Sequence, residues 1–168
     1  CESSATPPFS SPTNTVVAPG MNQPRPGEAE TETALTHWLG QGARQDSRLA
    51  LRYALRGAEA GFPDACFLLG TMYYNDGPGF PRNLGESLHW YRRAAEQGHS
   101  SAQYNLGQMY RDGKGVKVDH AEAVKWFRKA ATQGLAFSQT ELGLFLQKGW
   151  GIAADQWGSI YMEAVPNK

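Results

Sequence analysis

The sequence is dominated by a repeat with a period of 36 to 37 residues. Segment 101–110 (SAQYNLGQMY) aligns with 64–73 (DACFLLGTMY) upstream and with 137–146 (FSQTELGLFL) downstream. A period in this range is typical of stacked two-helix units, none of which can bury its apolar face alone. The sequence therefore predicts an all-α array, an architecture that generally binds other molecules and rarely catalyses reactions.

The rest of the unit repeats as well. After each first helix comes a Gly-x-Gly motif, as expected where a helix end leads into a tight loop at positive φ. Next comes a polar residue whose side chain can accept hydrogen bonds from the first amides of the second helix. The glycines are Gly77, Gly79, Gly113, Gly115, Gly149 and Gly151, and the caps are Asn83, Asp119 and Asp155. The second helices are predicted near 86–98 and 122–134, with a weaker earlier copy near 47–60 that Asp46 caps.

A buried stripe is predicted on each second helix, because small and aromatic residues recur there at i, i+3, i+4 and i+7. Its members are Ser87, Trp90, Tyr91, Ala94, Ala123, Trp126, Phe127 and Ala130. Trp38 and Tyr53 are assigned to the core of the first unit.

The motifs between Ala102 and Gly134 resemble the Sel1-like repeat, a relative of the tetratricopeptide repeat. They read Ala-x-x-x-Leu-Gly-x-Met-Tyr, Gly-x-Gly-Val-x-x-Asp and Ala-x-x-Trp-Phe-Arg-Lys-Ala-Ala-x-Gln-Gly. The resemblance covers residues 30–164 and implies an α/α solenoid that acts as a protein-binding adaptor. The expected domain is 29–168, about three and a half units with bounds near 29–61, 62–98, 99–134 and 135–168.

Residues 1–28 form a different kind of segment. They hold six of the ten prolines and few large apolar residues, so they are predicted to be a disordered linker. Cys1 before this Ser/Pro/Thr-rich stretch resembles the mature start of a bacterial lipoprotein, which implies acylation of Cys1. Glu2 then implies a periplasmic protein that is lipid-anchored to the outer membrane. The alternative is an arbitrary boundary of the chain that happens to fall at a cysteine.

Composition argues against several functions. Sixteen basic residues balance sixteen acidic ones, which disfavours nucleic-acid binding, and no apolar run is long enough to span a membrane. The four histidines lack metal-ligand spacing, and Cys66 is expected to be a buried thiol. We therefore expect no catalytic residue, metal, cofactor or small-molecule substrate. Matching basic residues on the second helices are interpreted as a solvated outer face: Arg92, Arg93, Arg128 and Lys129.

A partner-binding face is predicted on the first helices, at positions that differ from unit to unit. Spacings of about i, i+4, i+7 and i+11 place these positions on one face of each helix, and the first helices of such solenoids line the concave surface. The candidates are Leu68, Thr71, Asn105, Gln108, Asp112, Glu141, Leu144, Lys148 and Trp150. Plain solvent exposure is the alternative.

Two classes of function remain. The short array and the implied lipid tether resemble Sel1-repeat immunity proteins, which neutralise lipase-type toxins that type VI secretion delivers into the periplasm. The alternative is an envelope scaffold that assembles or stabilises a secretion or polysaccharide-export complex. Immunity is favoured because so few units offer one partner-sized surface and little room to bridge several proteins.

Overall fold

The computed structural model describes residues 25, 27–42, 44–76 and 81–150. Seven α-helices make up the regular structure of this described part of the chain. They are α1 (Glu28–Leu39), α2 (Ser47–Glu59), α3 (Pro63–Tyr74), α4 (Leu84–Glu96), α5 (Ser100–Asp112), α6 (His120–Thr132) and α7 (Ala136–Lys148). The predicted all-α fold is confirmed. The predictions for Cys1, Gly77, Gly79, Gly151 and Asp155 lie outside the described residues.

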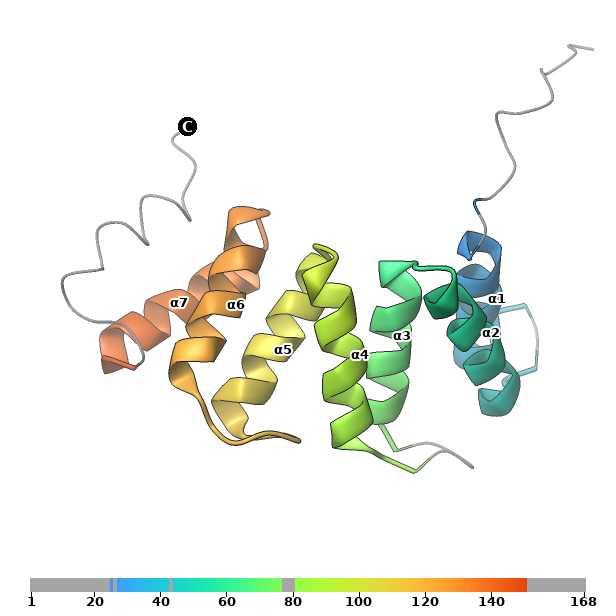
Figure 1. Cartoon of the computed structure of the whole chain (residues 1–168), viewed down its shortest axis with the longest axis horizontal. Helices are drawn as coiled ribbons and strands as arrows, with labels where there is room; N and C mark the ends of the chain where they lie inside the picture. The colour runs from blue at the N-terminus through green and yellow to red at the C-terminus, as the bar shows by residue number, and fades with distance from the viewer. Residues whose placement is uncertain (1–24, 26, 43, 77–80, 151–168) are drawn as a thin grey trace, which may run out of the picture.

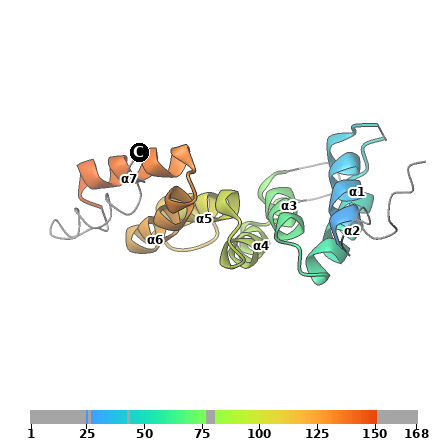
Figure 2. The same ribbon diagram turned by 90° about the horizontal axis from the view of Figure 1, so that it is seen from above.

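The helices form a curved row of antiparallel pairs, and each helix packs mainly on its neighbours in sequence (Figure 1). Figure 2 shows α1, α3, α5 and α7 along the inner side of the curve and α2, α4 and α6 along the outer side. We call these sides the inner face and the outer face. The sequence analysis placed the first helix of each unit on the inner face, as observed.

The second helices begin at the predicted caps. The Asp46 carboxylate accepts from the amides of Arg48 and Leu49 at 3.0 and 3.1 Å. Asn83 and Asp119 each accept from the amide three residues on, at 3.1 and 3.0 Å. These bonds satisfy amides that no helical carbonyl can reach. Local sequence therefore fixes where each outer helix starts.

Glycine is required in the loop after α5 by its neighbours as well as by its own backbone. Gly115 has a φ of 72°, and a Cβ there would lie 2.5 Å from the carbonyl oxygen of Leu84. From the same loop, Lys114 donates to the Tyr74 hydroxyl at 2.6 Å. The loop of one unit is thus held against the unit before it.

The second and third units are each closed by the fit between a glycine on the inner helix and an aromatic ring on the outer helix. A Cβ on Gly70 would lie 2.5 Å from Tyr91, and one on Gly107 would lie 2.7 Å from Phe127. In the first unit Ala34 stands at the glycine position and Ala54 at the aromatic position, and both are fully buried. In this unit the contact between a glycine and a ring is thus replaced by a pair of small side chains.

The predicted buried stripe is confirmed in most of its members, while some aromatic rings lie only partly in the core. Ser87, Tyr91, Ala94, Ala123, Trp126, Phe127 and Ala130 are buried. Trp38, Tyr53 and Trp90 are partly buried against the core. Their remaining ring surface is available to cations, and the Arg93 guanidinium lies 5.5 Å from the centre of Trp90.

The outer-face arginines are more than solvated charges, which corrects the sequence interpretation. Arg92 donates to the Tyr110 hydroxyl, and Arg93 donates to the carbonyl of Ala58 at 3.2 Å. Both bonds join different units, because a long side chain on one outer helix reaches the neighbouring pair.

Cys66 is a free, fully buried thiol, as predicted. Burial raises its pKa, so it carries little thiolate at neutral pH. None of the described helices is long and apolar enough to span a bilayer. Among the described residues, no three His, Cys, Asp or Glu side chains gather in a way that could hold a metal ion.

His99 joins α3 to α5 in a way that depends on its protonation. Its Nδ1 accepts from the Ala102 amide at 3.2 Å, so it caps α5, and its Nε2 lies 3.1 Å from an Asp64 carboxylate oxygen. The ring stacks on Phe67 at 4.5 Å. Burial lowers the pKa of His99, and the nearby Asp64 carboxylate opposes this shift.

We expect stability to fall as the pH drops below the usual histidine pKa of about 6.5. The pKa of His99 is lower in the folded state than in the unfolded state, so its contribution is complete above the unfolded value and is lost as acid protonates Nδ1. Urea midpoints measured between pH of about 7.5 and about 5.5 check this. His99→Asn, which retains a cap, should flatten the dependence, whereas His89→Asn at an exposed site should not. Equal slopes in all three proteins would contradict the assignment to His99.

Candidate partner-binding face

The structure places most predicted partner-binding residues on the inner face, with one correction. Leu68 is only 5% exposed and belongs to the hydrophobic core. In the repeat register it aligns with Asn105 and Glu141, which are half-buried. Helical spacing predicted the correct side of α3, but the apolar side chain of Leu68 packs into the core. The polar side chains of Asn105 and Glu141, at the same position of the repeat, stay nearer to solvent. Leu68 is thus unavailable to a partner.

The centre of the inner face is polar and already internally bonded. Thr71 Oγ1 and the Tyr91 hydroxyl lie 3.1 Å apart, and Gln108 donates to the Tyr104 hydroxyl at 2.8 Å. Burial raises the pKa of Tyr91, and hydrogen bonds with Thr71 and Asn105 oppose that shift. Thr71, Asn105 and Gln108 are therefore held in fixed positions and present a preordered surface for hydrogen bonding.

A charged cluster lies between the C-terminal end of α5 and the middle of α7. Arg111 donates to Asp112 at 2.6 Å and to Glu141 at 2.7 Å, and Lys114 lies 3.4 Å from Asp112. The hydrogen bond from Arg111 is the main cause that lowers the pKa of Asp112, and the same bond raises the pKa of Arg111. Because the charges neutralise one another, the cluster connects α5 to α7 and leaves little net charge for a partner.

A pocket of about 330 Å³ opens beside this cluster. Trp150 forms one wall, stacked on His120 with ring centres 4.6 Å apart, and the Lys148 ammonium lies 4.3 Å from the centre of Trp150. The residues that line it come from α5, the start of α6, and α7 with Trp150: Arg111, Asp112, His120, Glu141, Leu144, Phe145, Lys148 and Trp150. The predicted residues Asp112, Glu141, Leu144, Lys148 and Trp150 are brought together here.

Exposed apolar side chains lie at both ends of the row of inner helices, on α1 and on α7. Phe137 and Leu144 on α7 are 70% and 44% exposed, and Leu35 and Leu39 on α1 are 40% and 55% exposed. Leu35 occupies the same position of the repeat as Thr71, Gln108 and Leu144.

Leu35 and Leu39 were not predicted from the sequence because the first unit departs most from the repeat. The spacing of Leu35 from Thr71 was the available signal. Arg111 and His120 were also missed, since their roles come from contacts with residues 30 positions away.

Comparison with known proteins places the chain among repeat proteins. The Sel1 repeat signature matches residues 27–62, 63–99, 100–135 and 136–156. Chitin synthase regulatory factor 4 of Schizosaccharomyces pombe is 34% identical over 79 residues, which is 45% of this chain and 12% of that protein. Chitin synthase regulator SKT5 of Saccharomyces cerevisiae is 37% identical over 73 residues, which is 41% of this chain and 10% of that protein. The chain therefore spans only about a tenth of these two relatives.

Solved structures agree with this relationship. A Sel1 repeat protein from Oxalobacter formigenes superposes with a TM-score of 0.73 at 31% identity, covering 82% of this chain and 57% of that one. A protective antigen of uropathogenic Escherichia coli with an SLR fold gives a TM-score of 0.74 at 37% identity, covering 83% of this chain and 30% of that one. The repeat signature matches most of the chain and the structures reproduce its helical row, so this protein belongs to the Sel1 repeat family.

Proposed function

We propose that the inner face binds a single protein partner and that the protein acts through this binding, without chemistry of its own. The observation that carries the proposal is the pattern of the inner face, with exposed apolar side chains at both ends and a preordered polar centre. Leu35 and Leu39 mark one end, and Leu144 and Trp150 mark the other. Protein interfaces combine exposed apolar anchors with positioned hydrogen-bonding groups, and the inner face offers both. The protein-binding role general to Sel1 repeat proteins supports the proposal.

As the specific partner we propose a secreted toxin of the phospholipase type, which would make this chain an immunity protein. A short array with one continuous inner face suits the capture of one protein. The second candidate is an envelope scaffold for a secretion or polysaccharide-export complex. The two curated relatives favour a role of this second kind, because both are regulators of another enzyme, chitin synthase, by name.

Co-expression tests the choice between the two candidates. The protein is produced in the periplasm together with the toxin-like product of a neighbouring gene, and cell survival and co-purification are measured. Survival that depends on this protein, with a stable complex of the two chains, supports immunity. Death despite expression, combined with co-purification of envelope components at native levels, supports the scaffold.

We further propose that Cys1 is acylated and holds the array at the periplasmic side of the outer membrane. The Ser/Pro/Thr-rich composition of residues 2–15 supports this proposal, as it suits a tether. With a lipoprotein signal, Cys1→Ser should move the protein from the membrane fraction to the soluble fraction, since one acylated residue supplies the whole anchor. Immunoblots of the two fractions measure this. Wild-type protein in the soluble fraction would contradict the proposal.

A further inference from the structure

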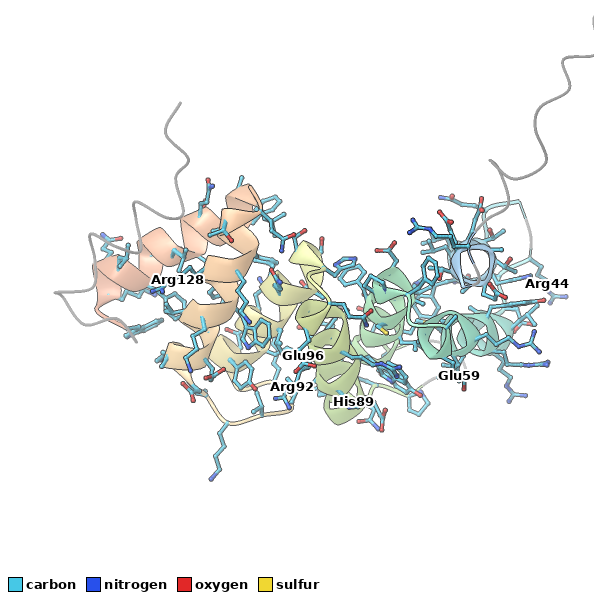
Figure 3. All side chains as sticks on the ribbon, turned by 45° about the horizontal axis from the view of Figure 1, so that its top comes forward. Arg44, Glu59, His89, Arg92, Glu96 and Arg128 are labelled. Atoms are coloured by element: carbon cyan, nitrogen blue, oxygen red, sulfur yellow. The ribbon has the colours of Figure 1, made fainter. Side chains whose placement is uncertain are left out.

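One helix of this chain, whose formal net charge is zero, carries an unbalanced stripe of arginines. Arg48, Arg52 and Arg56 are spaced at i, i+4 and i+8 on α2, so they project from one side of the helix with a rise of about 6 Å between neighbours. All three are exposed, and Arg44, just before the helix, is exposed as well. Figure 3 shows Arg44 at the end of the array formed by α1 and α2, pointing away from the other helices. We call these four residues the arginine stripe.

The charges of the arginine stripe are not neutralised within the described part of the chain. Each of the six ion pairs there involves residues outside the stripe. Asp46 is the nearest carboxylate in sequence, and its oxygen is occupied by two backbone amides. Glu59, in the last turn of α2, is the other acidic residue of this helix. The stripe therefore carries a local positive excess.

Two surface hollows lie along the arginine stripe. The larger, of about 610 Å³, lies between α1 and the start of α2, and Arg44 and Arg48 are among its lining residues. The smaller, of about 50 Å³, is lined by Leu49, Arg52, Tyr53 and Arg56. Guanidinium groups that flank a hollow can bind the oxygens of a phosphate in a forked, bidentate manner.

The residues around the arginine stripe favour an anionic surface over a protein as its partner. Protein interfaces have an apolar core depleted of charge, and none of the exposed large hydrophobic residues in the described structure lies on α2. Four exposed arginines outnumber the two exposed acidic residues of this segment, Asp46 and Glu59. Such a face suits a surface that offers many phosphates at once.

We propose that the arginine stripe of α2 binds the anionic headgroups of a membrane, so that the first unit lies against the lipid surface. This places the inner face of the array at a defined orientation to the membrane, with α7 and the pocket at Trp150 far from the lipid along the row. The choice of lipid as the anion rests on the proposed attachment at Cys1, whereas the phosphate-binding character of the stripe does not.

The test uses the full chain expressed without a signal sequence, and hence without an acyl chain. Membrane binding by the arginine stripe is then tested independently of the proposed lipid anchor at Cys1. Binding is measured by co-sedimentation with vesicles of phosphatidylcholine alone and with vesicles that also contain phosphatidylglycerol. We expect wild type to bind only the anionic vesicles and to be released by high salt. Arg52→Gln should weaken binding about fivefold, and the triple change of Arg48, Arg52 and Arg56 to Gln on the order of a hundredfold.

The matched control changes Lys117, Lys125 and Lys129 to Gln, which removes the same charge from exposed sites at the other end of the array. It should bind vesicles within a few-fold of wild type. Circular dichroism of each variant verifies folding, and Arg52→Gln provides the test if the triple variant is unfolded. Absence of wild-type binding, or equal losses in both triple variants, would overturn the proposal. Tighter binding of single-stranded DNA than of anionic vesicles would assign the stripe to nucleic acid and would overturn it as well.

Discussion

Replacing Phe127 with alanine is expected to lower the free energy of unfolding by about 3 to 5 kcal/mol. Phe127 is fully buried, lies over Gly107, and packs edge-on against Phe145 of the next unit at 5.6 Å. Its removal leaves a cavity between α5, α6 and α7, which affects two units of the row. A loss of this size approaches the whole stability of a domain of this length.

The fit between Phe127 and Gly107 leads to a related prediction about the glycine and about the double variant. Gly107→Ala alone should cost about 1 to 3 kcal/mol, because its Cβ would lie 2.7 Å from the ring. The double variant Gly107→Ala with Phe127→Ala should cost clearly less than the sum, since Ala34 and Ala54 show that two alanines can occupy these positions. Residues in contact are expected to depart from additivity in this way.

Urea unfolding followed by circular dichroism measures all three variants. Gly85→Ala is the control, because a Cβ there meets only the Asn83 side chain, at an ordinary contact distance of 3.5 Å. This change should be neutral or slightly stabilising. Strict additivity of the two core changes would show that the helices adjust independently and that the glycine is not there to accommodate the ring.

The second large effect is expected on partner binding. Leu144→Ala and Trp150→Ala should each weaken binding by about 2 kcal/mol or more, which is roughly thirtyfold, because a few large side chains that lose contact with water on binding carry most of the energy of a protein interface. Both residues line the pocket beside α7, and Lys148 and His120 hold the Trp150 ring. Isothermal titration calorimetry with the partner identified by co-expression measures the effect.

The matched control for these anchors is Val118→Ala. Val118 is an exposed apolar residue in the loop between α5 and α6, and it is not among the residues that line the pocket at Trp150. We expect it to change affinity by less than about 0.5 kcal/mol. Arg92 is unsuitable as an outer-face control. Its side chain donates to the Tyr110 hydroxyl of the next unit, so its removal would disturb the packing of two units. Loss of binding on changing Val118 but not Leu144 would move the interface off the inner face.

Much of the fold follows from local sequence. The caps at Asp46, Asn83 and Asp119 could be predicted because a cap needs only a short polar side chain two or three residues before a free amide. The likeness to known solenoids implies that the first helix of each pair lies inside, and the repeat extends this arrangement from unit to unit. Cys66 was expected to be buried because it neighbours the repeated alanine of an inner helix.

Which side chains are exposed on the surface of the array depends on tertiary contacts, and the repeat pattern does not predict these contacts. Leu68 occupies a predicted inner-face position and yet is buried, because its side chain packs into the core. Leu35 joins the inner face from a helix whose sequence pattern has largely faded. The pocket at Trp150 exists because His120, from another helix, stacks beneath its ring.

The sequence by itself determined the class of fold and the helix starts, because these depend on spacings within a few residues and on a repeated unit, while the likeness to known solenoids implied which helices face inward. Only the tertiary structure decided which side chains on the inner face remain exposed, and which charges are already paired. Arg111 and Glu141 are 30 residues apart in the chain, yet they form an ion pair at 2.7 Å. Contacts of this kind depend on how neighbouring units rotate against each other, which the packing of whole side chains determines and residue spacing alone does not.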